Sequence, residues 1–227
     1  MSLGIVIPTL NEEEHLAGIL EDLARLEVGR DIVVVDGGSE DATAAVAARA
    51  GVRVLRAPRG RALQMNAGAA VVTGEWLCFL HADVRMPADA RAALRETVAR
   101  PQADAAVWKL AVEGAGVWMR VVEAGALLRD RLGGLPYGDQ GFLVRRTVFE
   151  AVGGFPSLPI MEDVALARAV RRRTRLARLP AALVASGRRW RREGAYRTWI
   201  RNAVLMTAYL AGTPPERLAR WYPPEPR

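Results

Sequence analysis

The chain has few of the features that mark disulfide-linked, secreted or membrane-spanning proteins. Its 227 residues include a single cysteine, Cys78, so no internal disulfide can form and nothing indicates an oxidising compartment. The N-terminus lacks the basic stretch that precedes the apolar part of a secretory signal. The longest late apolar segment, near residues 203–211, is shorter than the ~20 residues that a spanning helix needs. We therefore expect a soluble, cytoplasmic protein.

Lysine is almost absent too, and arginine takes its place. Lys109 is the only lysine among 32 basic residues, and the net charge is +7. The segments "RAVRRRTRLAR" and "SGRRWRREGAYRTWIR" concentrate arginines in the last third of the chain. Arginine forks suit phosphates, anionic lipid head groups or nucleic acid. An ordinary solvated basic face would have the same composition, so each arginine alone leaves both interpretations open.

Two phosphate-binding motifs are missing. No G-x-G-x-x-G follows the first apolar run, and no G-x-x-x-x-G-K-[ST] occurs anywhere. The first absence removes the phosphate loop of dinucleotide-binding proteins, and the second excludes the P-loop nucleotide hydrolases.

What the first 100 or so residues do contain is a regular alternation of strand-like and helix-like segments. The strand-like runs are Leu3–Ile7, "DIVVVDGG", "VRVLRA" and "EWLCFLHAD", and the helical segments start after Asn11 and span Ala42–Ala50, Gly60–Val72 and Pro87–Arg100. Asn11 is placed to cap the first of these helices. The alternation predicts an α/β fold whose open, mostly parallel sheet is flanked by helices. Such sheets bind ligands at the carboxyl ends of their strands.

Beyond residue 100 the alternation becomes less regular. The expected elements are a strand over Ala103–Val112, a helix over Val117–Leu132, the loop "GGLPYGDQG", the strand "FLVRR", a helix over Ile160–Arg173, the strand "AALVAS" and an amphipathic helix over Trp199–Leu210. No linker or repeat interrupts the chain, so we expect one domain.

Polar residues follow three of the predicted strands. They are Pro8 to Glu12, Asp36 to Ser39, and His81 to Asp83. Asp36 could accept a hydrogen bond from a base or a ribose hydroxyl, although "DGGS" alone is an ordinary turn. If the fourth strand stays extended to its end, His81 and Asp83 project from the same face. Asp83 is a suitable oxygen ligand for Mg²⁺ or Mn²⁺, whereas His81 fits a supporting position better.

Four further segments combine residue types that could bind or react. Arg59–Gly60–Arg61 precedes a helix and is either an anion site or a basic turn. Glu162 and Asp163 open a helix, where acidic residues are favoured anyway, and Asp163 is also placed to act as a general base. Arg188, Arg189 and Trp190 follow the last strand and could close over a diphosphate or stack on a sugar. Tyr137, Asp139 and Gln140 lie in a glycine-rich loop that suits a lid, an acceptor-binding loop or a surface loop without a role.

In this order, the segments resemble the inverting family 2 glycosyltransferases of the GT-A fold. The resemblance is carried by "IVIPTLNEEEHL", "VVVDGGSEDAT", "RGRALQMNAGA", "FLHADVR", "MEDVAL" and "SGRRW". It implies a single GT-A domain over residues 1–227, with a nucleotide-binding half (1–100) and an acceptor-binding half with basic C-terminal helices (101–227). More narrowly, "RGRALQMNAGA", "FLHAD" and "YGDQGFLVRR" resemble a small bacterial subgroup associated with radical-SAM and selenium-domain genes.

The resemblance implies an inverting transfer, by metal-assisted single displacement, from a UDP- or GDP-sugar to an unidentified acceptor. Asp163 would be the catalytic base, and Asp83 would hold Mg²⁺ or Mn²⁺. The nucleotide-sugar site would comprise Pro8, Asn11, Glu12, Asp36, Arg61, Asn66, Ala82 and Asp83. The diphosphate and acceptor would be contacted by Tyr137, Asp139, Gln140, Glu162, Arg188, Arg189 and Trp190.

Two positions depart from the family pattern. His81 stands where the family has the first aspartate of its D-x-D motif, which leaves Asp83 as the obvious carboxylate ligand. No glutamine stands three residues before Arg189, where the family has Q-x-x-R-W. Together with the absence of spanning helices, this second departure argues against a processive polysaccharide synthase.

Other functions stay open. A nucleotidyltransferase shares the sheet and the metal carboxylate, but its first loop is expected to be glycine-rich and basic, whereas "PTLNEEE" is acidic. A peripheral membrane glycosyltransferase would use the basic last third to reach a lipid or carotenoid-like acceptor. We expect no nucleic-acid partner, and the sequence leaves a homo-oligomer open.

Overall fold

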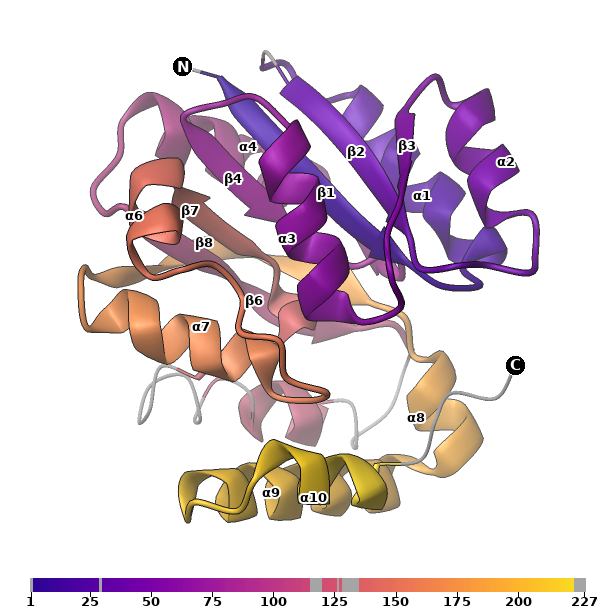
Figure 1. Cartoon of the computed structure of the whole chain (residues 1–227), viewed down its shortest axis with the longest axis vertical. Coiled ribbons are helices and arrows are strands. Elements are labelled where there is room, and N and C mark those ends of the chain that lie inside the picture. Colours follow the sequence, from indigo (N-terminus) through magenta and orange to yellow (C-terminus); the bar gives the residue numbers. More distant parts are fainter. Residues whose placement is uncertain (1, 29, 115–119, 126, 128–134, 223–227) are drawn as a thin grey trace.

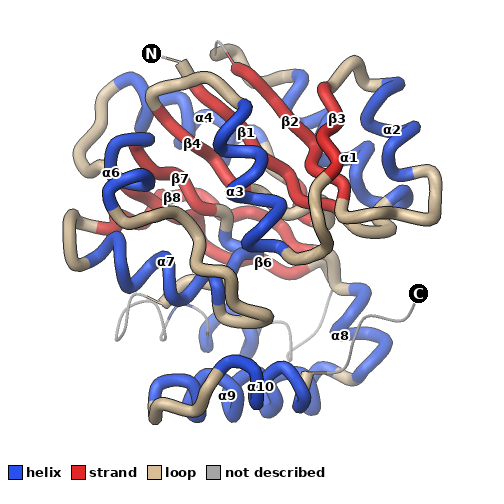
Figure 2. Tube along the Cα trace, viewed as in Figure 1, coloured by secondary structure: helices blue, strands red, loops and turns tan. Residues whose placement is uncertain are grey.

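The computed structural model describes residues 2–28, 30–114, 120–125, 127 and 135–222 (Figure 1). Within these residues the chain forms one eight-stranded sheet in the order β3-β2-β1-β4-β7-β6-β8-β5. Helices cover both faces of the sheet, and a further group of helices lies beyond one edge (Figures 1 and 2).

The first half of the chain builds the parallel part of the sheet. Its strands are β1 (Leu3–Thr9), β2 (Arg30–Asp36), β3 (Arg53–Arg56) and β4 (Trp76–Phe79), and β1 lies between β2 and β4. The β1 side chains are buried from Leu3 to Thr9, as expected for a strand covered on both faces. The predicted parallel sheet is therefore confirmed for this half.

The second half adds strands in mixed directions. They are β5 (Val84–Arg85), β6 (Ala105–Val112), β7 (Phe142–Arg145) and β8 (Leu176–Ala185). Strand β7 runs antiparallel to both β4 and β6, whereas β6 and β8 are parallel and β5 pairs with β8 antiparallel. The complete sheet is therefore mixed, and β7 joins its two parallel parts.

Three groups of helices surround the sheet. One face is covered by α1 (Glu13–Ala24), α2 (Thr43–Arg49) and α4 (Ala88–Ala99), and the other by α3 (Arg61–Val71), α6 (Arg146–Ala151) and α7 (Glu162–Arg171). The third group comprises α8 (Arg188–Glu193), α9 (Ala195–Leu210) and α10 (Pro215–Trp221). In Figure 1, α9 and α10 lie below α7, away from β1–β3. Among the described residues, every helix is too short or too polar to traverse a lipid bilayer.

Helix α3 packs unusually close to the parallel strands because it carries a glycine at the contact. A Cβ atom on Gly68 would lie 2.3 Å from Cγ1 of Val6 and 2.9 Å from Cγ2 of Val35. Any side chain here would push the helix away from β1 and β2. Gly68 thus lets α3 lie directly on the sheet, and this contact positions the helix N-terminus, with Arg61, near the carboxyl ends of the strands.

Several local predictions require correction. Strand β4 ends at Phe79, so His81 lies in the connection after the strand and Asp83 in the turn that follows, and neither is part of an extended strand. Pro8 does not end the first strand, because β1 continues to Thr9. Asn11 does not cap α1, since the Asn11 Oδ1 accepts a hydrogen bond from the Glu40 N–H instead.

The second half shows further differences. Strand β8 begins at Leu176, well before the predicted "AALVAS", and α9 begins at Ala195 and not at Trp199. Arg188 and Trp190 belong to α8 and do not extend the preceding strand. About half of the predicted helix over Val117–Leu132 lies outside the described residues, and its described residues, 120–125 and 127, are helical.

Candidate active site

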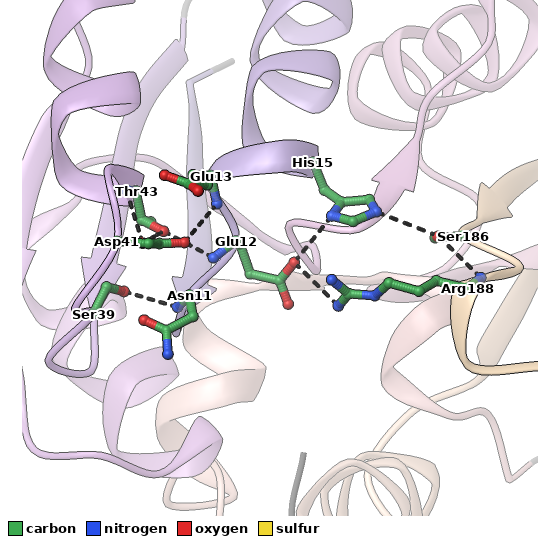
Figure 3. A network of polar contacts seen from close by, with 9 residues as sticks. All are labelled: Asn11, Glu12, Glu13, His15, Ser39, Asp41, Thr43, Ser186 and Arg188. Atoms are coloured by element: carbon green, nitrogen blue, oxygen red, sulfur yellow. Dashed lines mark hydrogen bonds and ion pairs between the residues drawn. The ribbon is translucent and has the colours of Figure 1, made fainter. Parts of the chain in front are cut away.

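Two loops at the carboxyl ends of β1 and β2 are joined by hydrogen bonds, and we call residues 11–13 and 39–43 the β1–β2 rim. The Asn11 N–H donates to Ser39 Oγ (2.9 Å), and the Asn11 Oδ1 accepts from the Glu40 N–H (2.8 Å). Asn11 adopts a left-handed backbone conformation (φ 55°), which asparagine tolerates better than most residues. Figure 3 shows the contact between Asn11 and Ser39. These hydrogen bonds hold the two loops in one arrangement.

Asp41 and Thr43 cap α1 from the neighbouring loop. The Glu12 N–H donates to Thr43 Oγ1 (2.8 Å), and the Glu13 N–H donates to Asp41 Oδ2 (3.1 Å) (Figure 3). Asp41 Oδ1 also accepts from the Thr43 hydroxyl (2.5 Å) and N–H (2.9 Å). Burial raises the pKa of Asp41, but these hydrogen bonds outweigh burial and hold the pKa below its usual value.

Asp36 supports the turn that follows β2. Its carboxylate accepts hydrogen bonds from the Ser39 hydroxyl (2.5 Å) and from the N–H groups of Gly38 and Ser39, and its side chain is buried. Pro8 pairs with Val35 of β2 within the sheet, and Ala82 packs in the hydrophobic core. These residues lie at the predicted strand ends, and their contacts here shape the site. A direct nucleotide contact from any of them stays a proposal.

Glu12 connects the β1–β2 rim to the start of α8. Its Oε2 lies 3.5 Å from Nδ1 of His15 and 3.7 Å from Nη2 of Arg188. Ser186 completes the network, because its hydroxyl is 3.5 Å from Nε2 of His15 and accepts from the Arg188 N–H (3.3 Å) (Figure 3). The structure therefore brings together Glu12 and Arg188, which lie far apart in the sequence and were both predicted for the site.

The neighbouring parts of the predicted R-R-W element are less informative. The side chain of Arg189 lies outside the described part of the structure, and Trp190 is half-buried in α8.

A pocket of about 410 Å³ opens next to the Glu12 network, and Asp83, His15 and Ser186 are among its lining residues. Asp83 is thus accessible from this pocket.

The N-terminus of α3 contacts the N-terminus of α7 through an ion pair. The Nε of Arg61 lies 2.7 Å from Oε1 of Glu162, and the Glu162 side chain is 3% exposed. Asn66, one turn further along α3, donates to the Phe155 carbonyl (2.8 Å) and accepts from the Phe155 N–H (2.9 Å). Arg61 and Glu162, which were assigned to different parts of the site, therefore form an ion pair, whereas the Asn66 amide fastens α3 to the loop before α7.

Asp163 receives backbone hydrogen bonds on both carboxylate oxygens. The Gly138 N–H donates to Oδ2 (2.6 Å), and the Val164 N–H donates to Oδ1 (2.7 Å). A Cβ atom on Gly138 would lie 2.4 Å from Nε2 of His81 and 3.5 Å from Oδ2 of Asp163. His81, Gly138 and Asp163 therefore lie close together, and a side chain at position 138 would require the His81 ring or the loop to move.

The surroundings of Asp163 favour its neutral form more than water does. Burial and the charge of Glu162 raise its pKa to about 6, although Arg61 and the two N–H donors act in the opposite direction. A carboxyl group with such a pKa changes its protonation close to neutral pH, as a general base requires. This pKa is compatible with the role of base, which stays a prediction for Asp163.

The loop before β7 includes a 3₁₀ turn, η1 (Gly138–Gln140), that Gln140 holds in place. Gln140 is completely buried, and its amide accepts from the Tyr137 N–H (3.1 Å) and donates to the Trp108 carbonyl (3.2 Å). The Tyr137 hydroxyl donates to the Asn202 carbonyl of α9 (3.3 Å). Asp139, which directly precedes Gln140 in the sequence, is half-buried. Gln140 thus supports the loop, and its burial argues against direct acceptor contact.

Across the described residues, no group of three or more His, Cys, Asp or Glu side chains forms a ready-made metal site. Asp83 supplies one accessible carboxylate, and the His81 ring packs against Gly138. Mg²⁺ and Mn²⁺ sites in phosphate-binding enzymes commonly use one or two carboxylates and complete their shell with substrate phosphates and water. The residues present fit a metal that is held by Asp83 together with a diphosphate.

Sequence reasoning missed several residues that shape the site. Gln64, buried in α3, donates to the carbonyls of Thr9 and Val35 (both 2.8 Å) and so ties the ends of β1 and β2 together. His15 and Ser186 connect Glu12 to α8. A polar residue on the buried face of α3 was the one available signal for Gln64, whereas nothing in the sequence places Ser186 near α1.

Comparison with known proteins gives a match to a family model and to individual relatives. A model of the family described as "Glycosyl transferase family 2" matches residues 4–133. An uncharacterised glycosyltransferase of Mycobacterium tuberculosis is 40% identical over 88 residues, which are 38% of this chain and 39% of that protein. A PGL/p-HBAD biosynthesis glycosyltransferase of the same species is 39% identical over 88 residues, covering 35% of this chain and 34% of the relative. The match thus spans about two fifths or less of these relatives.

Solved structures share the fold over most of the chain. TarS of S. aureus (residues 1–349) in complex with UDP-GlcNAc has a TM-score of 0.67 at 18% identity, over 82% of this chain and 58% of that chain. The mannosyltransferase PcManGT from Pyrobaculum calidifontis, in complex with GDP-Man and Mn²⁺, has a TM-score of 0.66 at 20% identity, over 96% and 68%. At such identities the likeness concerns the fold, and the predicted GT-A type of α/β fold is confirmed.

Proposed function

The chain belongs to glycosyl transferase family 2, and we propose that it moves a sugar from a nucleotide-diphosphate sugar to a hydroxyl group of an acceptor, with inversion at the anomeric carbon. The observation that carries this proposal is the position of Asp163. Its carboxylate is aimed by two backbone N–H groups, has a pKa raised to about 6, and lies beside the strand ends where α/β folds bind their ligands.

Asp163 acts as the general base. The acceptor hydroxyl gives its proton to the carboxylate as its oxygen attacks the anomeric carbon, and the bond to the nucleoside diphosphate breaks on the opposite side. One displacement of this kind inverts the configuration. The Gly138 and Val164 N–H groups hold the carboxylate in one orientation, so that the base is in place before the acceptor arrives.

The nucleoside diphosphate is bound at the carboxyl ends of β1, β2 and β4. Asp36 and the β1–β2 rim form the base and ribose side, and Arg61 and Arg188 supply cations on either side of the diphosphate. Both arginines are partly exposed and each is paired with a glutamate, Glu162 and Glu12 respectively. This proposal is supported by solved relatives that bind UDP-GlcNAc and GDP-Man.

Asp83 would hold Mg²⁺ or Mn²⁺ on the diphosphate, and the cation would offset the negative charge that develops on the leaving group. One solved relative contains Mn²⁺ beside GDP-Man. Because Asp83 is the one carboxylate of the shortened D-x-D element, we expect metal binding to depend on the donor being present.

A thermal-shift panel tests the function directly. We expect one class of nucleotide-sugar, UDP- or GDP-linked, to raise the melting temperature in the presence of Mn²⁺, because a ligand that binds the folded state stabilises it. The Asp83→Asn variant should lose the metal-dependent part of the shift and keep its own melting temperature. Stabilisation by nucleoside triphosphates alone would favour a nucleotidyltransferase, and no shift with any nucleotide would contradict the proposal.

A further inference from the structure

One face of α9 exposes apolar side chains in a continuous row. Tyr196, Ile200 and Val204, which we call the α9 stripe, are 55%, 37% and 51% exposed and recur at four-residue spacing. Residues four apart lie on the same side of a helix. Leu210, further along α9, and Trp221 on α10 are also exposed, by 50% and 55%. Large apolar side chains gathered on one exposed face indicate a contact surface.

The opposite face of α9 is used to build the protein. Leu205 and Met206 are buried in a small hydrophobic cluster with Met161 and Val164, the residues that flank the α7 carboxylates. The Tyr137 hydroxyl also bonds to the Asn202 carbonyl on this side. The α9 stripe therefore belongs to the outer surface of a helix whose inner surface supports Asp163.

The surroundings of the α9 stripe are strongly basic. Residues 188–222 contain eight arginines and only two acidic residues. One of the two, Glu193, is already paired with Arg201 (2.5 Å) and lies 3.4 Å from Arg192. Helix α9 itself has no acidic residue. The exposed arginines of this region are Arg191, Arg192, Arg197, Arg217 and Arg220.

From this combination we infer that the α9 stripe docks on an anionic lipid bilayer, with α9 lying in the plane of the head groups. Tyrosine and tryptophan are favoured at that depth, and arginines beside an apolar face attract anionic lipids. Docking brings the N-terminus of α7, and with it Asp163, close to the membrane surface. The exposed apolar side chains of the α9 stripe and the charge of the surrounding arginines carry this inference, and the proposed glycosyl transfer is not needed for it.

Two other occupants fit the surface less well. A second copy of the chain would bring two sets of arginines against each other, and like charges that face each other oppose association. A nucleic acid would pair with the arginines, but it would leave the exposed apolar row of α9 without a partner. An anionic bilayer matches both the charge and the apolar side chains.

Vesicle co-sedimentation tests the inference with matched variants. The stripe variant Tyr196→Gln/Ile200→Gln/Val204→Gln replaces exposed apolar residues by a good helix former. The control variant Leu63→Gln/Val71→Gln changes two apolar residues of α3 that are similarly exposed, at 40% and 36%. Each protein is mixed at low salt with vesicles of phosphatidylcholine alone or of phosphatidylglycerol and phosphatidylcholine in equal parts. Melting temperatures confirm that each variant is folded.

We expect the natural protein to sediment with the phosphatidylglycerol vesicles. The stripe variant should bind these vesicles at least about tenfold more weakly, and the control variant should bind them as the natural protein does. Failure of the natural protein to sediment at low salt would overturn the inference. An equal loss of vesicle binding in the stripe and control variants would overturn it as well. The inference would also fail if the natural protein bound no vesicles and formed a dimer that the stripe variant could not form. Donor binding, measured without vesicles, reports separately on the proposed function.

Discussion

Asp41 and Asp163 occupy similar places and have opposite properties. Each lies at a helix N-terminus and accepts two backbone N–H groups. Asp41 also accepts the Thr43 hydroxyl, and its pKa is lowered, whereas Asp163 is buried beside the carboxylate of Glu162 and its pKa is raised to about 6. The comparison teaches that backbone donors alone do not decide the role of a carboxylate. Hydrogen bonds keep the Asp41 carboxylate ionised near neutral pH, where it holds two loops together, whereas burial and the neighbouring charge of Glu162 make Asp163 able to exchange a proton.

Removing the proton acceptor should have the largest effect. Asp163→Asn keeps an oxygen for the Gly138 N–H but cannot act as a base. We expect release of nucleoside diphosphate from the donor to fall roughly 10²–10⁴-fold, with the donor thermal shift unchanged. A rate near that of the natural protein would show that another group takes the proton.

Disturbing the donor that aims Asp163 should have an intermediate effect. In Gly138→Ala, the new Cβ would lie 2.4 Å from Nε2 of His81, so either the ring or the loop must move, and movement of the loop takes its N–H away from the carboxylate. We expect nucleoside diphosphate release to fall about 10- to 100-fold.

The matched control removes the obstacle. The double variant His81→Ala/Gly138→Ala should be as active as His81→Ala alone, because the ring no longer blocks the new Cβ. If Gly138→Ala is equally harmful with and without the ring, the steric explanation is incorrect.

The equivalent change on the β1–β2 rim should affect stability and leave the base untouched. Asp41→Ala removes the side-chain partner of the Glu13 N–H, and we expect the free energy of unfolding to fall by about 1–2 kcal/mol in urea denaturation. Since the folded pKa of Asp41 is lowered, its contribution is complete above its unfolded value of 3.8 and is lost as the pH falls below it. A loss that persists unchanged at pH 2–3, if the protein stays folded there, would mean that the ionised carboxylate is not its source.

Much of the fold could be predicted from the sequence where the pattern is local. The apolar runs that became β1 and β2 are covered on both faces, and the helices between the strands begin and end within a few residues of the predictions. The second half was less predictable. The start of β8 carries Arg178 and Pro180, which conceal the strand, and its pairing with β6 over a long register is a tertiary effect.

The candidate site shows a similar division. The α7 carboxylates and Arg61 were identified from residue type and order, and the structure brings them together. The positions of His81 and Asp83 were predicted incorrectly because strand pairing ends at Phe79. Asn11 lost its expected capping role to contacts with residues 28 or more positions away, which no local pattern reveals.

The smallest expected effect gives the most direct test of the central claim, that Asp163 is the base and that its neighbours set its pKa. We predict that kcat/KM for nucleoside diphosphate release falls as the pH drops below about 6. Glu162→Gln removes a negative charge beside Asp163, which lowers the pKa of Asp163 and should move this acidic limb of the pH profile to lower pH by about one unit. Arg61→Gln removes a cation, which raises that pKa and should move the limb to higher pH. Both variants are also made in the His81→Ala background, so that the ring beside Gly138 and Asp163 cannot account for the shifts. Limbs that coincide in all three proteins, or that move together in one direction, would contradict the account.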